Sequence, residues 1–389
     1  MKKVMKHINM FICAIFYYIW TALHKKDYSL WLFGAWKGKT YNDNPKYLFE
    51  YVSANNPEIK AVWVTKNQAI YDSIKNKGLK VVMYPSKEAN KLINRAGVMF
   101  QSEGSRDIGY YPVGRTRVVQ LYHSIPAKSL GWFEKYKGIK QHIINIECDN
   151  NKKSYWLCPS LYYKKLIQNV FDVPDDHFLK VGFPRNDMIA VDAHNKYILE
   201  LRKNYEKIVL YLPTHRNWGK DFDLKFVENG LLRMDKFAFN KKICFLYKPH
   251  PNEIELIKNA VVDLQNVKVL EGSDFEDLYD YLYECDLLIS DYSGVIYDFL
   301  PSNKPIVLFD YDLENYQAND GGVPEDYFSH QVGPICNTWE DMLKQVSALL
   351  ENDEWKNKRM SETDYFNARC NGNNSRLLVK IVKDMFVDN

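Results

Sequence analysis

The stretch LLISDYSGVIYDF, residues 287–299, is the most informative part of this 389-residue chain. Its first residues form an apolar run typical of a buried strand, and its last residues follow a helical pattern. Between them, Asp291, Ser293 and Gly294 form a polar turn. A strand, a turn and a helix N-terminus together present backbone N–H groups that can bind phosphate. An ordinary strand-to-helix connection capped by Ser or Asp would look the same, so the other motifs decide.

Apolar runs and amphipathic stretches alternate on both sides of this stretch. Such alternation predicts parallel sheets covered by helices, so the predicted fold class is α/β. The alternation restarts after GFPRND, residues 182–187, whose Gly and Pro break the pattern. We therefore predict two Rossmann-like domains, at 27–187 and 188–389, with a terminal helix that could cross back. Strands are predicted at 30–33, 61–65, 80–84, 97–100 and 117–121, and then at 207–212, 243–247, 267–270, 287–290 and 306–309.

The composition excludes several functions. A chain of this length is expected to form two domains. A net charge of only +3 does not fit a nucleic-acid partner. The seven cysteines contain no C-x-x-C pair, which favours reduced thiols and the cytoplasm. No Walker loop, G-x-G-x-x-G, H-E-x-x-H or G-x-S-x-G occurs, so we predict no cofactor. The acid pair of Asp310 and Asp312 is isolated, and we predict no metal.

The N-terminus carries an apolar run, INMFICAIFYYIWTAL at residues 8–23, with lysines on both sides. These sixteen residues are fewer than the roughly 20 that cross a bilayer. Flanking lysines and interfacial aromatic residues are typical of a helix that lies on an anionic membrane surface. We predict a membrane-associated segment over residues 1–26, at the cytoplasmic face of the cell membrane. A buried core helix and a short, tilted span are the alternatives.

Four polar clusters follow predicted strands. They are QLYHS at 120–124, LPTHR at 212–216, KPHP at 248–251 and DYSG at 291–294. Ligands of open α/β sheets bind beyond the carboxyl ends of the strands. The clusters therefore predict one site in a cleft between the two halves.

Histidine is the residue of interest in two of these clusters. His123 is a candidate general base, because the unperturbed pKa of histidine, about 6.5, lies near physiological pH. The alternative is a histidine that is only hydrogen-bonded within its loop. His250 lies between Pro249 and Pro251, which restrict the backbone and so aim the imidazole. Such rigid placement is typical of a catalytic or phosphate-binding group.

Three basic residues are candidate phosphate ligands. Arg216 could bind a phosphate in bidentate fashion. Arg185 could do the same, or it could pin the junction between the halves to a carboxylate. Lys128 is either a phosphate contact or an ordinary solvated lysine.

Together these motifs resemble the CDP-glycerol glycerophosphotransferases, the enzymes that make wall teichoic acid and related capsule polymers. The resemblance runs nearly from end to end, and the order and spacing of its pieces make it specific. The pieces are FG at 33–34 with YNDNP at 41–45, HSIPAK at 123–128, GFPRND at 182–187, YLPTHR at 211–216, KPHP at 248–251, SDYS at 290–293, and the segments 305–316 and 367–376.

The resemblance implies a GT-B architecture of two Rossmann-like domains and a phosphoryl transfer without a cofactor. An acceptor hydroxyl would attack the β-phosphorus of CDP-glycerol or a related CDP-alditol, and CMP would leave. The two family histidines map to His123, as general base, and to His250. The acceptor would be a lipid-linked saccharide or growing polymer, met at the anionic membrane surface. The donor's diphosphate would be held by His250 together with Thr214, Arg216, Lys248, Asp291, Ser293 and Gly294.

Three departures from the family pattern stand out. The family usually has glycine after the first histidine, where this chain has Ser124. Its acidic turn usually reads D-Y-S-S, where this chain ends on Gly294. Its R-G-x-Y segment is replaced by GGVP at 321–324. Because the last two lie near the donor, glycerol, ribitol and other alditols all remain candidate donor groups.

Two other functions remain open at this point. A GT-B glycosyltransferase that uses a UDP- or GDP-sugar would have the same fold and diphosphate site, with Glu314 as a weak candidate for gripping the ribose. A non-catalytic membrane-bound scaffold is the other alternative. The presence of His123, Arg216, His250 and Ser293 together argues against it.

Overall fold

The computed structural model describes residues 2–111, 113–125, 152–214, 224–249, 254, 255, 257, 264–271, 277–319, 323 and 327–388, with the backbone alone for residues 2–11. The chain divides into two compact units. The first unit contains the described residues within Met1–His123, Tyr136–Asp187 and Ala368–Asn389, and the second contains those within Ser124–Lys135 and Met188–Asn367.

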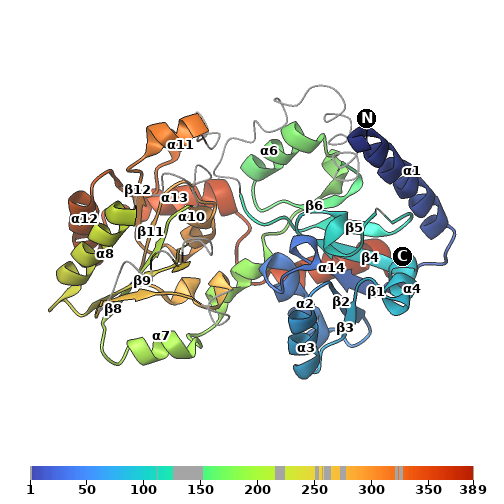
Figure 1. Ribbon diagram of the computed structural model, residues 1–389, viewed down its shortest axis with the longest axis horizontal. Coiled ribbons are helices and arrows are strands. Elements are labelled where there is room, and N and C mark those ends of the chain that lie inside the picture. The colour runs from blue at the N-terminus through green and yellow to red at the C-terminus, as the bar shows by residue number, and fades with distance from the viewer. Residues whose placement is uncertain are drawn as a thin grey trace. The chain divides into compact units, whose positions relative to one another are not determined.

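The first unit is built on a parallel sheet with the strand order β3-β2-β1-β4-β5-β6-β7 (Figure 1). Its central strands are almost continuously apolar, as expected for parallel strands covered on both faces. The order reverses between β1 and β4, which makes their carboxyl ends the switch point of the sheet. The strands are β1 (Asp27–Phe33), β2 (Lys60–Thr65), β3 (Val81–Met83), β4 (Ala96–Gln101), β5 (Arg117–Gln120), β6 (Tyr155–Leu157) and β7 (Phe178–Leu179).

Helices cover this sheet, and polar side chains define where several of them begin. Asn67, Ser86 and Ser160 each accept a hydrogen bond from a backbone N–H of the first turn, which satisfies a donor that the helix cannot. The C-terminal helix α14 belongs to this unit and contacts α2. The helices are α1 (Lys2–Ala22), α2 (Asp43–Asn55), α3 (Gln68–Asn76), α4 (Lys87–Arg95), α6 (Leu161–Phe171) and α14 (Asn374–Phe386).

Helix α1 is attached to the first unit through its C-terminal half. The buried hydroxyl of Thr21 accepts a hydrogen bond of 2.8 Å from the N–H of Gly114. The helix lies so close to Gly114 that a Cβ there would overlap the carbonyl oxygen of Tyr18. On its other side, α1 leaves Phe16 70% and Trp20 59% exposed. In the described part of the chain, no helix combines the length and apolar character needed to cross a membrane.

The second unit contains another parallel sheet, in the order β10-β9-β8-β11-β12-β13. The order of this sheet reverses between β8 and β11, so their carboxyl ends form the second switch point. The strands are β8 (Lys207–Leu212), β9 (Ile243–Tyr247), β10 (Val267–Val269), β11 (Leu287–Ser290), β12 (Ile306–Phe309) and β13 (Ile335–Cys336).

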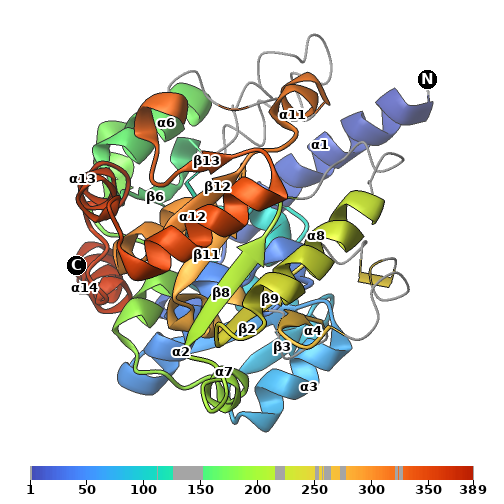
Figure 2. The same cartoon turned by 90° about the vertical axis from the view of Figure 1, so that its left-hand side faces the viewer.

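One face of the second sheet carries the main core of the unit. Helices α8 and α12 lie side by side over this face (Figure 2). Leu231 and Met234 of α8, and Met342 and Val346 of α12, are fully buried against it. The helices of the unit are α7 (Lys196–Leu201), α8 (Leu224–Ala238), α10 (Val295–Phe299), α11 (Leu313–Asn319), α12 (Trp339–Glu351) and α13 (Lys356–Asn367).

The predicted α/β class is confirmed by these two sheets. Every strand predicted from an apolar run overlaps an observed strand.

Candidate functional site

Asp107 organises the switch point of the first sheet. Its buried carboxylate accepts hydrogen bonds from the N–H groups of Lys37, at 2.6 Å, and of Ser102 and Glu103, at 2.8 and 2.7 Å. Burial raises the pKa of this carboxyl, and the N–H groups oppose that rise. The carboxylate thus joins the loop after β1 to the loop after β4.

His123 lies next to this switch point, after β5. The imidazole centroid is 5.3 Å from the ring of Trp36, which follows β1, and 4.2 Å from the ring of Tyr122. Nδ1 is buried and has no hydrogen-bond partner in the described structure. The half-buried ring is therefore held between two aromatic side chains, and its Nδ1 is covered by protein atoms.

The surroundings of His123 favour its neutral form. Burial is the main cause that lowers the pKa of its imidazole below the ordinary value, and the Arg185 guanidinium lowers it further. The carboxylates of Asp43 and Glu103 and a backbone hydrogen bond with Ser102 oppose this shift. Because only a neutral imidazole accepts a proton, the net direction suits a general base.

Asn44 fixes the backbone that leads into His123. Its Nδ2 donates to the carbonyl oxygens of Leu121 and Tyr122, at 3.3 and 2.9 Å, and its Oδ1 accepts from the N–H of Arg185 at 3.2 Å. One fully buried amide therefore connects the start of α2 with the histidine loop and with the segment at Arg185.

Arg185 makes a buried ion pair with Asp43. Its Nη1 lies 2.6 Å from Oδ1 of Asp43, and the two side chains are 3% and 6% exposed. This geometry supports the alternative in which Arg185 pins its segment to a carboxylate, here at the N-terminus of α2. Sequence reasoning assigned no role to Asp43 or Asn44, although both belong to the YNDNP motif.

The backbone around His123 is strained. Trp36, Lys37, Asp43 and Tyr122 all adopt positive φ angles, between 47° and 63°. Non-glycine residues rarely adopt this conformation, and where they cluster they tend to mark functional sites.

Thr214 and Asp291 meet at the switch point of the second sheet. Asp291, 1% exposed, accepts a hydrogen bond of 2.9 Å from the Thr214 N–H and one of 2.5 Å from the Thr214 hydroxyl. It also accepts from the N–H of Tyr292 at 2.7 Å. Thus the structure brings together two residues of the predicted donor set, with Asp291 holding the loop after β8. Lys248 follows β9, and its N–H donates to the carbonyl of Tyr211.

The turn at Ser293 and Gly294 leads into a helix of only five residues, α10. The N–H groups of Val295 and Ile296 bond to the side chain and carbonyl of Ser293. A Cβ at Gly294 would lie 2.6 Å from the Ser124 hydroxyl and 2.9 Å from the carbonyl oxygen of Ile125, both in the second unit. Glycine is therefore required here by close packing.

The remaining predicted residues, His250, Arg216 and Lys128, lie outside the described residues. Within the described ranges, no group of three or more His, Cys, Asp or Glu side chains could hold a metal ion.

The two parallel sheets, with polar residues gathered near both switch points, form a GT-B-like α/β fold. The chain matches the family model of the CDP-Glycerol:Poly(glycerophosphate) glycerophosphotransferases over residues 15–384, and it belongs to this family. The match spans almost the whole chain, including both switch points. The chain is thus a CDP-glycerol glycerophosphotransferase of teichoic acid biosynthesis by family, as the sequence motifs predicted.

Individual relatives agree with this assignment. The chain is 27% identical over 371 residues to the teichoic acid glycerol-phosphate transferase of Staphylococcus aureus (strain NCTC 8325 / PS 47), covering 91% of this chain and 92% of that protein. It is 24% identical to the teichoic acid poly(glycerol phosphate) polymerase of Bacillus spizizenii, with the same coverage. Among solved structures, the wall teichoic acid polymerase TagF matches its fold with a TM-score of 0.78, at 22% identity, over 100% of this chain and 98% of that one.

Proposed function

We propose that this protein transfers glycerol phosphate from CDP-glycerol to a hydroxyl group of a lipid-linked saccharide or growing polymer at the cytoplasmic face of the membrane. The first unit would hold the acceptor and the second unit the donor. The observation that carries the proposal is that His123 lies beside the first switch point, against the ring of Trp36, in surroundings that lower its pKa.

In the proposed reaction, the acceptor oxygen attacks the β-phosphorus of CDP-glycerol. A new P–O bond forms to the acceptor, and the bond from the β-phosphorus to the bridging oxygen breaks. CMP leaves with the bonding electrons, and the acceptor proton passes to neutral His123.

The second unit would bind and neutralise the diphosphate. His250 and Arg216 are the proposed contacts to the leaving CMP, with Lys248 and the Ser293 turn beside them. Thr214 and Asp291 support this set, because the carboxylate fixes the loop that leads to Arg216. No step in this scheme requires a cofactor.

Membrane association is the second part of the proposal. Helix α1 exposes Phe16, Ile19 and Trp20 and is flanked by lysines in the sequence. Exposed aromatic and aliphatic side chains beside lysines suit an anionic bilayer surface. This arrangement would bring the first unit to a lipid-linked acceptor.

CMP release tests the proposed reaction. Detergent-purified protein is mixed with CDP-glycerol, CDP-ribitol or UDP-glucose, with an undecaprenyl-diphosphate disaccharide as acceptor. We expect CMP release from CDP-glycerol and a loss of at least 100-fold in His123→Asn, the range expected for general-base catalysis. His194→Asn, an exposed histidine of the second unit, is the matched control.

Each donor points to a different conclusion. Release from CDP-ribitol alone would change the donor and keep the mechanism. UDP release from UDP-glucose alone would make the protein a glycosyltransferase. A folded His123→Asn variant with the turnover of the unmutated enzyme would refute the role of His123.

A further inference from the structure

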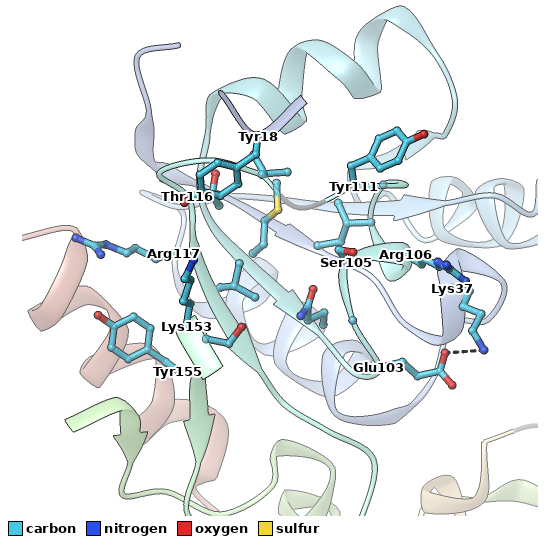
Figure 3. A pocket seen from close by; sticks show the side chains of 18 of the residues that line it. Tyr18, Lys37, Glu103, Ser105, Arg106, Tyr111, Thr116, Arg117, Lys153 and Tyr155 are labelled. Atoms are coloured by element: carbon cyan, nitrogen blue, oxygen red, sulfur yellow. Dashed lines mark ion pairs between the residues drawn. The ribbon is translucent and has the colours of Figure 1, made fainter. Parts of the chain in front are cut away.

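The first unit contains a pocket of about 400 Å³ to which the proposed reaction assigns no role. Met99 and Gln101 of β4 and Val118 of β5 form part of its wall. Figure 3 shows Lys37 and Arg106 on one side of the pocket, and Arg117 and Lys153 on the other. A volume of this size suits a small polar head group, and paired cations suit phosphate.

One end of the pocket is formed by helix α1. Tyr18 of this helix lines the pocket (Figure 3) and is 42% exposed. Its neighbours Phe16 and Ile19 are 70% and 54% exposed. The hydrogen bond from Gly114 to Thr21 fixes this part of the helix to the unit. The pocket therefore lies beside the apolar surface through which the protein would contact lipid.

The other end of the pocket reaches the surroundings of His123. Lys37 lines the pocket and directly follows Trp36, whose ring contacts the imidazole. Glu103 also lines the pocket, and its charge acts on the pKa of His123. Lys37 and Glu103 form an ion pair of 3.2 Å, so the only carboxylate lining the described pocket is already paired with a cation.

We propose that this pocket binds the diphosphate-linked sugar head of a lipid acceptor. The inference rests on the proposed function and assigns the acceptor to a place in the first unit. Arg106, Arg117 and Lys153 would bind the phosphates, while Glu103 would accept hydrogen bonds from sugar hydroxyls. The prenyl chain would leave past Tyr18 toward the exposed face of α1. An anionic phospholipid head group is the competing occupant.

The decisive experiment measures binding without any donor. Vesicles of neutral phosphatidylcholine, with or without an undecaprenyl-diphosphate disaccharide, are sedimented with the full chain. We expect the disaccharide lipid to strengthen binding, and the double variant Arg106→Ala/Lys153→Ala to lose at least tenfold of that gain. Both side chains are exposed, so the variant should fold. Lys165→Ala/Lys380→Ala removes two exposed lysines of the same unit that do not line the pocket.

A second set of vesicles separates the two lipid sources. Phosphatidylglycerol replaces the disaccharide lipid, and we expect the double variant to differ from the unmutated protein by less than threefold. An equal loss on both vesicle types would overturn the proposal in favour of a general phospholipid site. Binding that the disaccharide lipid does not strengthen, or that the double variant retains in full, would also overturn it.

Kinetic measurements distinguish a failure of this inference from a failure of the proposed function. In the active enzyme, the double variant should raise the KM for the acceptor at least tenfold, while the KM for CDP-glycerol stays within twofold. If the double variant releases CMP with an unchanged KM for the acceptor, the pocket does not bind the acceptor, and the proposed transferase reaction still stands. If the unmutated protein binds the disaccharide lipid through the pocket but releases no CMP, the proposed reaction is wrong, and the assignment of the pocket still stands.

Discussion

Ser124 and Gly294 approach each other so closely that a side chain at one position excludes a side chain at the other. A Cβ at Gly294 would lie 2.6 Å from Oγ of Ser124 and 2.9 Å from its Cβ. The family motifs usually have glycine at the first of these positions and serine at the second. Ser124 is therefore compatible with glycine at 294, although the carbonyl oxygen of Ile125, at 2.9 Å, also limits the space there.

This relationship predicts the outcome of exchanging the two residues. Gly294→Ser should destabilise the second unit by about 1–3 kcal/mol, the usual cost of overpacking, and should reduce activity. Adding Ser124→Gly removes two of the three close contacts and should restore most of both losses. Melting temperature and CMP release check this. If the double variant is as impaired as the sum of the two single variants, the residues are not coupled.

Removing one partner of the buried Asp43–Arg185 ion pair should destabilise the protein more than removing both partners. Asp43→Asn leaves a buried guanidinium without its counter-charge and should cost about 3–5 kcal/mol of stability. The apolar double variant Asp43→Leu/Arg185→Leu removes both charges, and we expect it to be more stable than Asp43→Asn. Chemical denaturation of the unmutated protein and of these two variants measures the difference. Lys60→Met, which breaks an exposed ion pair with Asp27, should cost about 1 kcal/mol or less.

The pH dependence of catalysis should reflect the lowered pKa of His123. Because the base must be neutral, kcat/KM should fall as the pH drops through a midpoint below 6.5, the ordinary histidine value. Glu103→Gln removes a negative charge that favours the protonated ring, so its midpoint should move to still lower pH. Glu88→Gln, exposed on α4, is the control. A midpoint that rises in Glu103→Gln would contradict this electrostatic account.

The hydroxyl group of Thr214 should contribute more to stability and donor binding than the volume of the side chain does. Thr214→Val keeps the shape but deprives the buried Asp291 carboxylate of a donor, at a cost of about 1–3 kcal/mol. The loosened loop should also raise the KM for CDP-glycerol. Thr214→Ser keeps the hydroxyl and should behave like the unmutated protein. Equal donor KM values in the valine and serine variants would show that the hydrogen bond does not support donor binding.

The sheets could be predicted from the sequence because buried parallel strands are continuous apolar runs. The strands that were missed, β6, β7 and β13, contain only two or three residues. Such short segments carry no periodic signal. The equally short β3 and β10 could be predicted because each lies within a longer apolar-rich run, at 80–84 and 267–270.

The candidate site could be predicted only in part. His123, Thr214 and Asp291 follow strands of four to six residues that stand out as apolar runs, so their place at a carboxyl end could be predicted from local pattern. The partners of these residues could not, because the Asp43–Arg185 pair joins positions 142 residues apart. The cationic pocket draws on residues from Tyr18 to His177, which no local motif connects.

Helix α1 is attached to the first unit by fixed contacts and not through a flexible linker. Its 21 residues extend about 30 Å, and the contacts at Gly114 and Thr21 join it firmly to the first unit. On a bilayer, the depth of the helix would therefore set the height of His123 above the lipid head groups. An acceptor hydroxyl could react only where its own reach matched that height. The distance of each acceptor hydroxyl from the membrane would then decide whether the enzyme starts a polymer or extends one.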